Sequence, residues 1–325
     1  MAMISKALRR LQVGPFGPEG LRLREQLWLT PSADPAITLR STLFRPAPTR
    51  APFPLAIINH GTPGSAVERM ALPTPSFYLL SSWFVDRGFA VLIPQRRGHG
   101  ATGTYHAESF RYPDGVDFTR AAGHGADDIE AAASYMRSQK FVQPDRVWIV
   151  GLSSGGWASL ALAARNPPFV RGVINIAGGR GGRVEGLPNN NLEPDRLVTS
   201  AASMGRPTRV PSLWLYARND KHFGPDLAIR LYEAWRAGGA PTEFHLLPAI
   251  GRDGHKLATQ LGGIQVCAPI IDAFIGKISN RDAPATSGAR PGRSGLGIFG
   301  QQPTKPPIDE VFGKSLHEGD FGADF

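Results

Sequence analysis

Cysteine is almost absent from this chain of 325 residues, which contains only Cys267. A single cysteine excludes an intrachain disulfide and any zinc site built on several thiolates. Because Cys267 lies in the apolar stretch 264–271, we expect its side chain to be buried. Long apolar runs are also lacking. None approaches the roughly 20 residues that a bilayer-spanning helix needs, so we predict no membrane span.

The N-terminus lacks the apolar segment that follows the basic residues of a secretory signal peptide. Lys6, Arg9 and Arg10 supply the basic residues, but no continuous apolar segment follows them. We therefore treat residues 1–20 as an N-terminal extension and expect a cytoplasmic location by default.

Acidic residues are fewer than basic ones, 27 against 36, and the formal net charge is +9. The excess arginines, such as Arg40, Arg45 and Arg50, are scattered and form no dense run. Nucleic-acid binders usually cluster basic residues on one recognisable module, so we expect no nucleic-acid partner. A basic surface that attracts small anionic substrates is the milder interpretation.

Residues 21–275 repeat a pattern of strand, turn and helix. The segments 21–29 and 37–44 alternate apolar and polar residues, which predicts an antiparallel pair. Six later segments are short continuous apolar runs, as in strands buried on both faces: 55–58, 90–93, 147–150, 172–176, 212–216 and 243–247. Helical segments at 77–87, 154–165, 226–237 and 257–275 separate them. This alternation predicts an α/β fold with a mostly parallel, twisted sheet of about eight strands flanked by helices.

The helix before residue 147 is expected to begin near Asp127. Asp127 and Asp128 would occupy its first turn, while Arg137 and Lys140 would occupy its last turn, which matches the helix dipole. After the sixth of the eight predicted strands, residues 178–210 form an insertion with a short helix near 196–204. We expect this insertion to be a small cap over the carboxyl edge of the sheet.

The apolar pattern ends near residue 276, so we predict one domain over 21–276. The remaining segment, 277–325, is rich in proline, glycine and serine, which predicts a disordered tail. Its last part, 307–325, mixes acidic and apolar residues. It is either a docking segment, for a protein partner or for the surface of the domain itself, or a solvated terminus.

The predicted strand 147–150 leads directly into Gly-Leu-Ser-Ser-Gly, with Ser153 at the centre, and an alanine-rich helix follows. A G-x-S-x-G motif between a strand and a helix predicts a nucleophile elbow. The glycines two positions before and after Ser153 would prevent collisions with the neighbouring strand and helix. The alternative is a tight Gly/Ser turn, or an anion site at the helix N-terminus.

A serine hydroxyl needs an adjacent base to act as a nucleophile. His255 follows the last predicted strand and is our predicted base, with His99 or His106 as the alternative. Asp220 follows the strand at 212–216 and is the predicted carboxylate that orients the imidazole. Asp253 is the competitor for that role.

Two other interpretations concern the same turn. The alternatives for Asp220 are a turn residue and the N-cap of the following helix. His222, two residues further on, is too close within the turn to be the imidazole partner of Asp220. The order serine, aspartate, histidine is the one that the nucleophile-elbow architecture uses.

An oxyanion hole needs backbone N–H donors aimed at the developing charge. Ser154, directly after the nucleophile, is one predicted donor. The loop after residue 58 supplies the other, and Thr62 is the first choice and Gly61 the second, because Pro63 has no N–H.

The chain resembles the α/β-hydrolase superfamily, and within it the dienelactone hydrolase-like proteins. Five segments carry this resemblance: 59–64, 94–100, 151–156, 213–220 and 253–255. The resemblance spans about residues 21–275. It implies the assignments of Ser153, Asp220 and His255 and of the oxyanion donors made above. Dienelactone hydrolases proper use a cysteine nucleophile, so Ser153 shifts the expected activity to the hydrolysis of a carboxylic ester (or lactone) through an acyl-enzyme. No cofactor and no metal are implied.

Arg96 and Arg97 follow the predicted strand at 90–93, and His60 follows the strand at 55–58. We predict that these three side chains line the substrate site and that the arginines anchor a substrate carboxylate. Salt bridges that fix the loop are the alternative. The other functions that remain open are a peptidase or an acyltransferase on the same fold, and a non-catalytic interaction protein.

Overall fold

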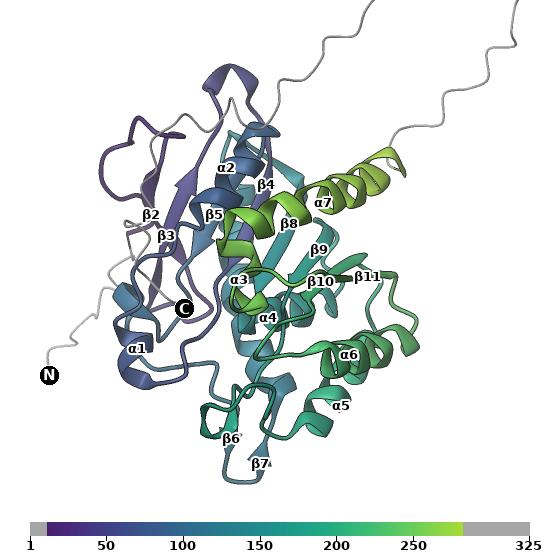
Figure 1. Ribbon diagram of the computed structural model, residues 1–325. Helices are drawn as coiled ribbons and strands as arrows, with labels where there is room; N and C mark the ends of the chain where they lie inside the picture. The colour runs from purple at the N-terminus through teal and green to yellow at the C-terminus, as the bar shows by residue number, and fades with distance from the viewer. Residues whose placement is uncertain (1–11, 282–325) are drawn as a thin grey trace, which may run out of the picture.

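The computed structural model describes residues 12–281, and Figure 1 shows how their helices and strands are arranged. The predicted docking segment 307–325, most of the predicted tail and residues 1–11 of the predicted extension lie outside the described residues.

A nine-stranded sheet forms the centre of the protein, in the order β1-β2-β3-β5-β4-β8-β9-β10-β11. Its strands are β1 (Gly14–Pro15), β2 (Gln26–Pro31), β3 (Thr38–Phe44), β4 (Phe53–Asn59), β5 (Ala90–Pro94), β8 (Val142–Leu152), β9 (Val170–Ile176), β10 (Ser212–Ala217) and β11 (Thr242–Leu247). The pairs from β1 to β5 are antiparallel, and all pairs from β5 to β11 are parallel. The predicted mostly parallel sheet is confirmed. The ninth strand, β1, lies within the segment 1–20 and is too short to show an alternating pattern.

Helices cover both faces of the sheet (Figure 1). One face carries α3 (Phe118–Arg137), α4 (Ser154–Ala163), α5 (Pro194–Gly205) and α6 (Pro225–Ala237), and the other carries α2 (Tyr78–Asp86) and α7 (Leu261–Arg281). Successive residues of a strand point to opposite faces. In β4, Leu55 and Ile57 therefore enter the first core, while Ala56 and Ile58 enter the second. Outside the two layers lie the short helix α1 (Ala66–Met70) and a hairpin of β6 (Arg111–Tyr112) and β7 (Gly115–Val116).

Helix α3 begins at Phe118, so the prediction that this helix starts near Asp127 was wrong. Asp117 caps the helix by accepting a hydrogen bond from the backbone N–H of Arg120 at 2.8 Å. The early part of the helix contains glycines, which disfavour helix formation in isolation. At Gly125, a Cβ would lie only 2.7 Å from the Cβ of Ala158 in α4. Close packing between the two helices therefore outweighs the low intrinsic propensity.

The insertion 178–210 divides into two parts. Helix α5 joins the layer of α3 and α6, with Leu197, Ala201 and Met204 in the first core. The preceding part contacts the loop after β10, where Asn191 Nδ2 donates to the carbonyl oxygen of His222 at 2.6 Å. The expected cap is thus reduced to the segment before α5.

Helix α7 completes the second core through Ile264, Ile271 and Phe274. Cys267 is 1% exposed, as predicted, and burial raises the pKa of its thiol to about 12. Within the described residues, Leu261–Asn280 is long and apolar enough to cross a membrane, judged by length and composition alone. The core helix of a globular domain passes the same test, so this feature is weak evidence for a span.

Candidate active site

The three predicted catalytic residues lie beyond the ends of three strands in the parallel part of the sheet. Ser153 follows β8, Asp220 follows β10 and His255 follows β11. Because β8, β9, β10 and β11 are parallel, their carboxyl ends share one edge, where ligand sites of such sheets occur.

Ser153 adopts a strained backbone conformation with φ 53° and ψ −124°, directly before α4. The glycines on either side have the predicted steric role. A Cβ on Gly151 would lie 2.3 Å from the carbonyl oxygen of Gly155, and a Cβ on Gly155 would lie 2.3 Å from that of Asn59 in β4. The turn therefore has the geometry of a nucleophile elbow, with the serine side chain held out from the strand end.

Asp220 and His255 form a direct pair. The imidazole Nδ1 of His255 lies 3.2 Å from Oδ1 and 3.1 Å from Oδ2 of Asp220. The carboxylate is 1% exposed, and its Oδ1 also accepts backbone N–H bonds from His222 at 2.7 Å and Phe223 at 2.9 Å. These bonds fix the carboxylate, so that it orients the imidazole and leaves Nε2 available.

Contacts through Gly179 and Phe223 link Ser153 to the Asp220–His255 pair. The carbonyl oxygen of Ser153 accepts a bond from the N–H of Gly179 at 3.2 Å. The ring of Phe223 packs against Gly179 and lies 5.6 Å, centroid to centroid, from the ring of His255. Within the described chain, no hydrogen bond joins the Ser153 hydroxyl to His255. Such catalytic bonds are often long before substrate binds.

Asp253 shapes the loop of His255. Its Oδ1 accepts hydrogen bonds from the backbone N–H groups of His255 and Lys221, both at 3.0 Å. Burial would raise the pKa of Asp253, but these two bonds together with the nearby imidazoles of His255 and His222 outweigh burial and hold the pKa below its ordinary value. Asp253 therefore joins the β10 and β11 loops, while Asp220 contacts the imidazole.

His222 is a component of the site that the sequence reasoning set aside. Its ring stacks on the ring of His255 with a centroid distance of 4.1 Å and an interplanar angle of 24°. Burial, followed by the proximity of His255, lowers the pKa of His222 to about 4. Only the occurrence of histidines in both strand-end loops hinted at this contact, because the stack depends on how the two loops meet in space.

The predicted oxyanion loop lies against Ser153. A Cβ on Gly61 would be 3.1 Å from Cβ and 3.6 Å from Oγ of Ser153. Ser154 Oγ donates to Thr62 Oγ1 at 2.8 Å, which links the loop to the first turn of α4. Within residues 12–281, the backbone N–H groups of Thr62 and Ser154 have no acceptor, so both remain available to a ligand.

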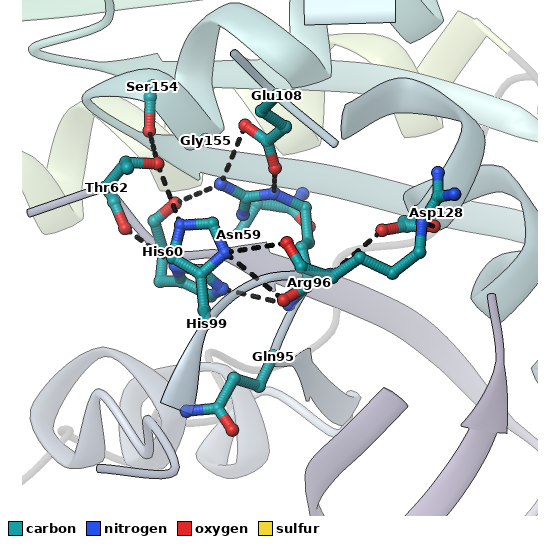
Figure 2. Close-up of polar contacts among 12 residues, drawn as sticks. Asn59, His60, Thr62, Gln95, Arg96, His99, Glu108, Asp128, Ser154 and Gly155 are labelled. Atoms are coloured by element: carbon teal, nitrogen blue, oxygen red, sulfur yellow. Dashed lines mark hydrogen bonds and ion pairs between the residues drawn. The ribbon is translucent and has the colours of Figure 1, made fainter. Parts of the chain in front are cut away.

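Two buried histidines hold the oxyanion loop (Figure 2). Nδ1 of His99 lies 3.2 Å from the carbonyl oxygens of Arg96 and Arg97, so Nδ1 carries the proton and Nε2 accepts from the Thr62 hydroxyl at 3.1 Å. Nδ1 of His60 lies 2.7 Å from the carbonyl oxygen of Gly61. Burial lowers the pKa of His99 to about 3 and that of His60 well below its ordinary value. Both rings are therefore neutral.

Both ring nitrogens of His60 thus form hydrogen bonds with the backbone. Its Nε2 accepts from the backbone N–H of Arg96 at 3.1 Å, while Nδ1 faces Gly61. The ring is 2% exposed. These contacts favour a structural role over the predicted role in substrate binding.

Arg96 and Arg97 are buried in ion pairs rather than directed at a pocket. Arg96 contacts Glu108 through Nε and Nη2, and Arg97 Nε contacts Asp128 Oδ1 at 2.7 Å. Arg180 also pairs with Glu108, so two guanidinium groups share one carboxylate. Burial would raise the pKa of Glu108, but the two guanidinium groups hold it well below its ordinary value. The structure favours the loop-fixing interpretation of both predicted arginines, and the partner carboxylates were not predicted.

One group of described residues has the chemistry of a metal site. Asp220, His222 and His255 each offer a ligand atom, and these atoms lie within 4.8 Å of one another. The sequence analysis implied no metal, and it considered His222 only as a partner of Asp220.

The parallel sheet, with a strained serine after β8 and an aspartate–histidine pair after β10 and β11, defines the α/β-hydrolase class of fold. The chain matches the model of the dienelactone hydrolase family over residues 47–252, more than half of its length. It therefore belongs to the dienelactone hydrolase family, a family of hydrolases. The match includes Ser153 and Asp220 and ends just before His255.

Curated relatives are similar to part of the chain. Poly(3-hydroxyalkanoate) depolymerase C of Paucimonas lemoignei is 28% identical over 142 residues, which are 42% of this chain and 31% of the depolymerase. Dipeptidyl aminopeptidase BIII of Pseudoxanthomonas mexicana is 31% identical over 133 residues, 39% of this chain and 17% of the peptidase. The chain thus matches a third or less of the length of these relatives.

Solved structures share the fold. The acetyl xylan esterase from Paenibacillus sp. R4 superimposes with a TM-score of 0.53 at 15% sequence identity. The superposition covers 83% of this chain and 88% of the esterase.

Proposed function

We propose that this protein is a serine hydrolase that cleaves a carboxylic ester (or lactone) through an acyl-enzyme on Ser153. His255 is the general base and Asp220 is the carboxylate that orients it. The proposal rests on one observation above all: a buried Asp220 bound to His255 Nδ1, at the same sheet edge as the strained Ser153.

The proposed reaction follows from the tautomer of His255. Because Asp220 accepts the Nδ1 proton, Nε2 is free to remove the proton of the Ser153 hydroxyl as Ser153 attacks the ester carbonyl. The imidazolium then gives this proton to the leaving alcohol. A water molecule repeats the attack on the acyl-enzyme and regenerates the serine.

The developing oxyanion would be bound by backbone N–H groups. In the described part of the chain the Thr62 and Ser154 N–H groups have no acceptor, and Gly61 is the second choice on the loop. The hydrogen bond between the Ser154 and Thr62 hydroxyls supports this arrangement because it holds the two donors relative to each other. A donor in such a hole typically contributes a factor of about 10²–10³ to turnover.

Ester cleavage is the first candidate because the chain belongs to a hydrolase family and the Paucimonas relative is a depolymerase named for a poly(3-hydroxyalkanoate). Peptide cleavage is the second candidate, which the similarity to the Pseudoxanthomonas peptidase favours.

The two candidates are separated by paired chromogenic substrates. We expect the wild-type protein to hydrolyse p-nitrophenyl esters faster than the matching p-nitroanilides, with a preference for short acyl chains. Ser153→Ala should lose this activity, whereas the matched control Ser138→Ala, on the surface after α3, should retain it. Faster cleavage of the anilides would favour the peptidase, and full esterase activity in Ser153→Ala would contradict the proposal.

A further inference from the structure

His222 carries an imidazole that the proposed reaction does not use. Its Nδ1 is buried and has no hydrogen-bond partner, and no hydrogen bond to its ring occurs within the described residues. Buried polar atoms without partners are rare in native proteins, and each one needs an explanation. The stacking of this ring on His255 brings the unpartnered nitrogen close to the Asp220–His255 pair.

Hydrogen bonds position the backbone of His222 next to the Asp220–His255 pair. The N–H of His222 donates to Asp220 Oδ1 at 2.7 Å, and its carbonyl oxygen accepts from Asn191 Nδ2 at 2.6 Å. These two bonds hold the backbone of His222 beside Asp220, and the ring, which stacks on His255, keeps its side-chain torsions free to rotate.

The distances between the three ligand atoms fit a metal ion once the atoms move slightly closer together. The ligand atoms of Asp220, His222 and His255 lie within 4.8 Å of one another. In a tetrahedral site with bonds of about 2.0–2.1 Å, neighbouring ligand atoms are roughly 3.4 Å apart. The widest pair must therefore approach by no more than about 1.4 Å, which a rotation of the half-buried His222 ring can supply.

We propose that Asp220, His222 and His255 bind a divalent transition-metal ion, Zn²⁺ or Cu²⁺, and that the bound ion inhibits the hydrolase. Two imidazoles and one carboxylate suit these two ions. Mg²⁺ and Ca²⁺ prefer sites composed of oxygen ligands, so they should not bind here.

The inhibition, unlike the metal binding, rests on the proposed function. Nδ1 of His255 faces Asp220 and carries the proton of the neutral ring. When the metal coordinates Nδ1, this proton moves to Nε2 and the imidazole stays neutral. Nε2 then has no lone pair to accept the proton of Ser153. Removal of the metal by a chelator restores the original tautomer and therefore the activity.

Metal binding is tested first, without any substrate. The full-length protein, free of a polyhistidine tag and stripped of metal, is titrated with ZnCl₂ and with CuCl₂ in a calorimeter. We expect one high-affinity site in the wild type, and binding weaker by about tenfold or more in His222→Gln. His222→Phe preserves the ring stack and should show the same loss, which separates a lost ligand from a disturbed fold.

His124→Gln is the matched control. His124 Nδ1 lies 3.7 Å from Asp127 Oδ2 on the surface of α3, so it is also a histidine–carboxylate pair, but it is not part of the three-ligand group. The high-affinity site should be unchanged in this variant. Equal Zn²⁺ affinity in the wild type and both His222 variants would overturn the proposed site.

Inhibition is tested second, with p-nitrophenyl acetate and each variant compared with its own metal-free rate. We expect Zn²⁺ to inhibit the wild type over the concentration range in which it binds, EDTA to reverse the effect, and MgCl₂ to have none. Ester hydrolysis that is indifferent to saturating Zn²⁺ would overturn the inhibitory role. Metal binding without any ester hydrolysis in metal-free buffer would instead contradict the proposed function and leave the metal site standing.

Discussion

Glu108 is the most informative position for the stability of the loops beneath the candidate site. It is fully buried, and it is the carboxylate shared by Arg96 and Arg180. Arg96 in turn donates to the carbonyl oxygen of His60 at 2.9 Å, next to the oxyanion loop. Figure 2 shows Glu108 and Arg96 beside His60. Replacing Glu108 with glutamine keeps the size of the side chain but removes its charge.

The expected cost is large because two guanidinium groups lose their counter-ion. Removing one partner of a buried ion pair typically costs about 3–5 kcal/mol, since the remaining charge stays buried without compensation. We therefore expect Glu108→Gln to lower the free energy of unfolding by at least about 3 kcal/mol. The matched control is Glu130→Gln, which breaks the half-exposed pair of Glu130 with Arg165 at 2.8 Å. Such a surface pair is worth about 1 kcal/mol or less.

Urea denaturation followed by tryptophan fluorescence measures both variants at pH 7. The pH dependence gives a second check. The pKa of Glu108 in the folded protein lies well below its ordinary value of 4.5, so the charged carboxylate stabilises the fold above that value. The difference between the wild type and Glu108→Gln should shrink as the pH falls below about 4.5. A loss in Glu108→Gln no greater than that in Glu130→Gln would refute the importance of the buried cluster.

Three further substitutions test the candidate site. Asp220→Asn should lower kcat by a factor on the order of 10⁴ with little change in KM, because the imidazole loses its orienting partner; a milder effect would argue against the pairing. Thr62→Pro removes an oxyanion N–H, whereas the control Thr62→Val removes only the hydroxyl. We expect kcat of Thr62→Pro to be about 10²–10³-fold lower than that of Thr62→Val, and equal rates would exclude this donor. Gly155→Ala places a Cβ 2.3 Å from the carbonyl oxygen of Asn59, so we expect thermal denaturation at a clearly lower temperature, and an unchanged Tm would contradict the close approach.

The sequence predicted the parts of the fold that depend on local patterns. Short apolar runs located the strands from β4 to β11 that build the parallel sheet, and the ends of these strands located Ser153, Asp220 and His255. The G-x-S-x-G motif predicted a steric constraint that the backbone of Gly155 bears out.

Features that depend on contacts between distant segments were not predictable in this way. The start of α3 was missed because its glycines are favourable only when they pack against α4. The ion pair of Arg96 with Glu108 requires the loop after β5 to fold back on itself. The stack of His222 on His255 requires the loops after β10 and β11 to meet. In each of these places tertiary packing, and not the local pattern, decides the role of the residue.

The most direct test of the central claim is covalent labelling of the intact protein with a fluorophosphonate, analysed by mass spectrometry. We expect one adduct per chain on the peptide that contains Ser153, no adduct in Ser153→Ala, and strongly slowed labelling in Asp220→Asn. A folded wild-type protein that remains unlabelled, or a Ser153→Ala variant that is labelled at the same rate, would contradict the assignment of Ser153 as an activated nucleophile.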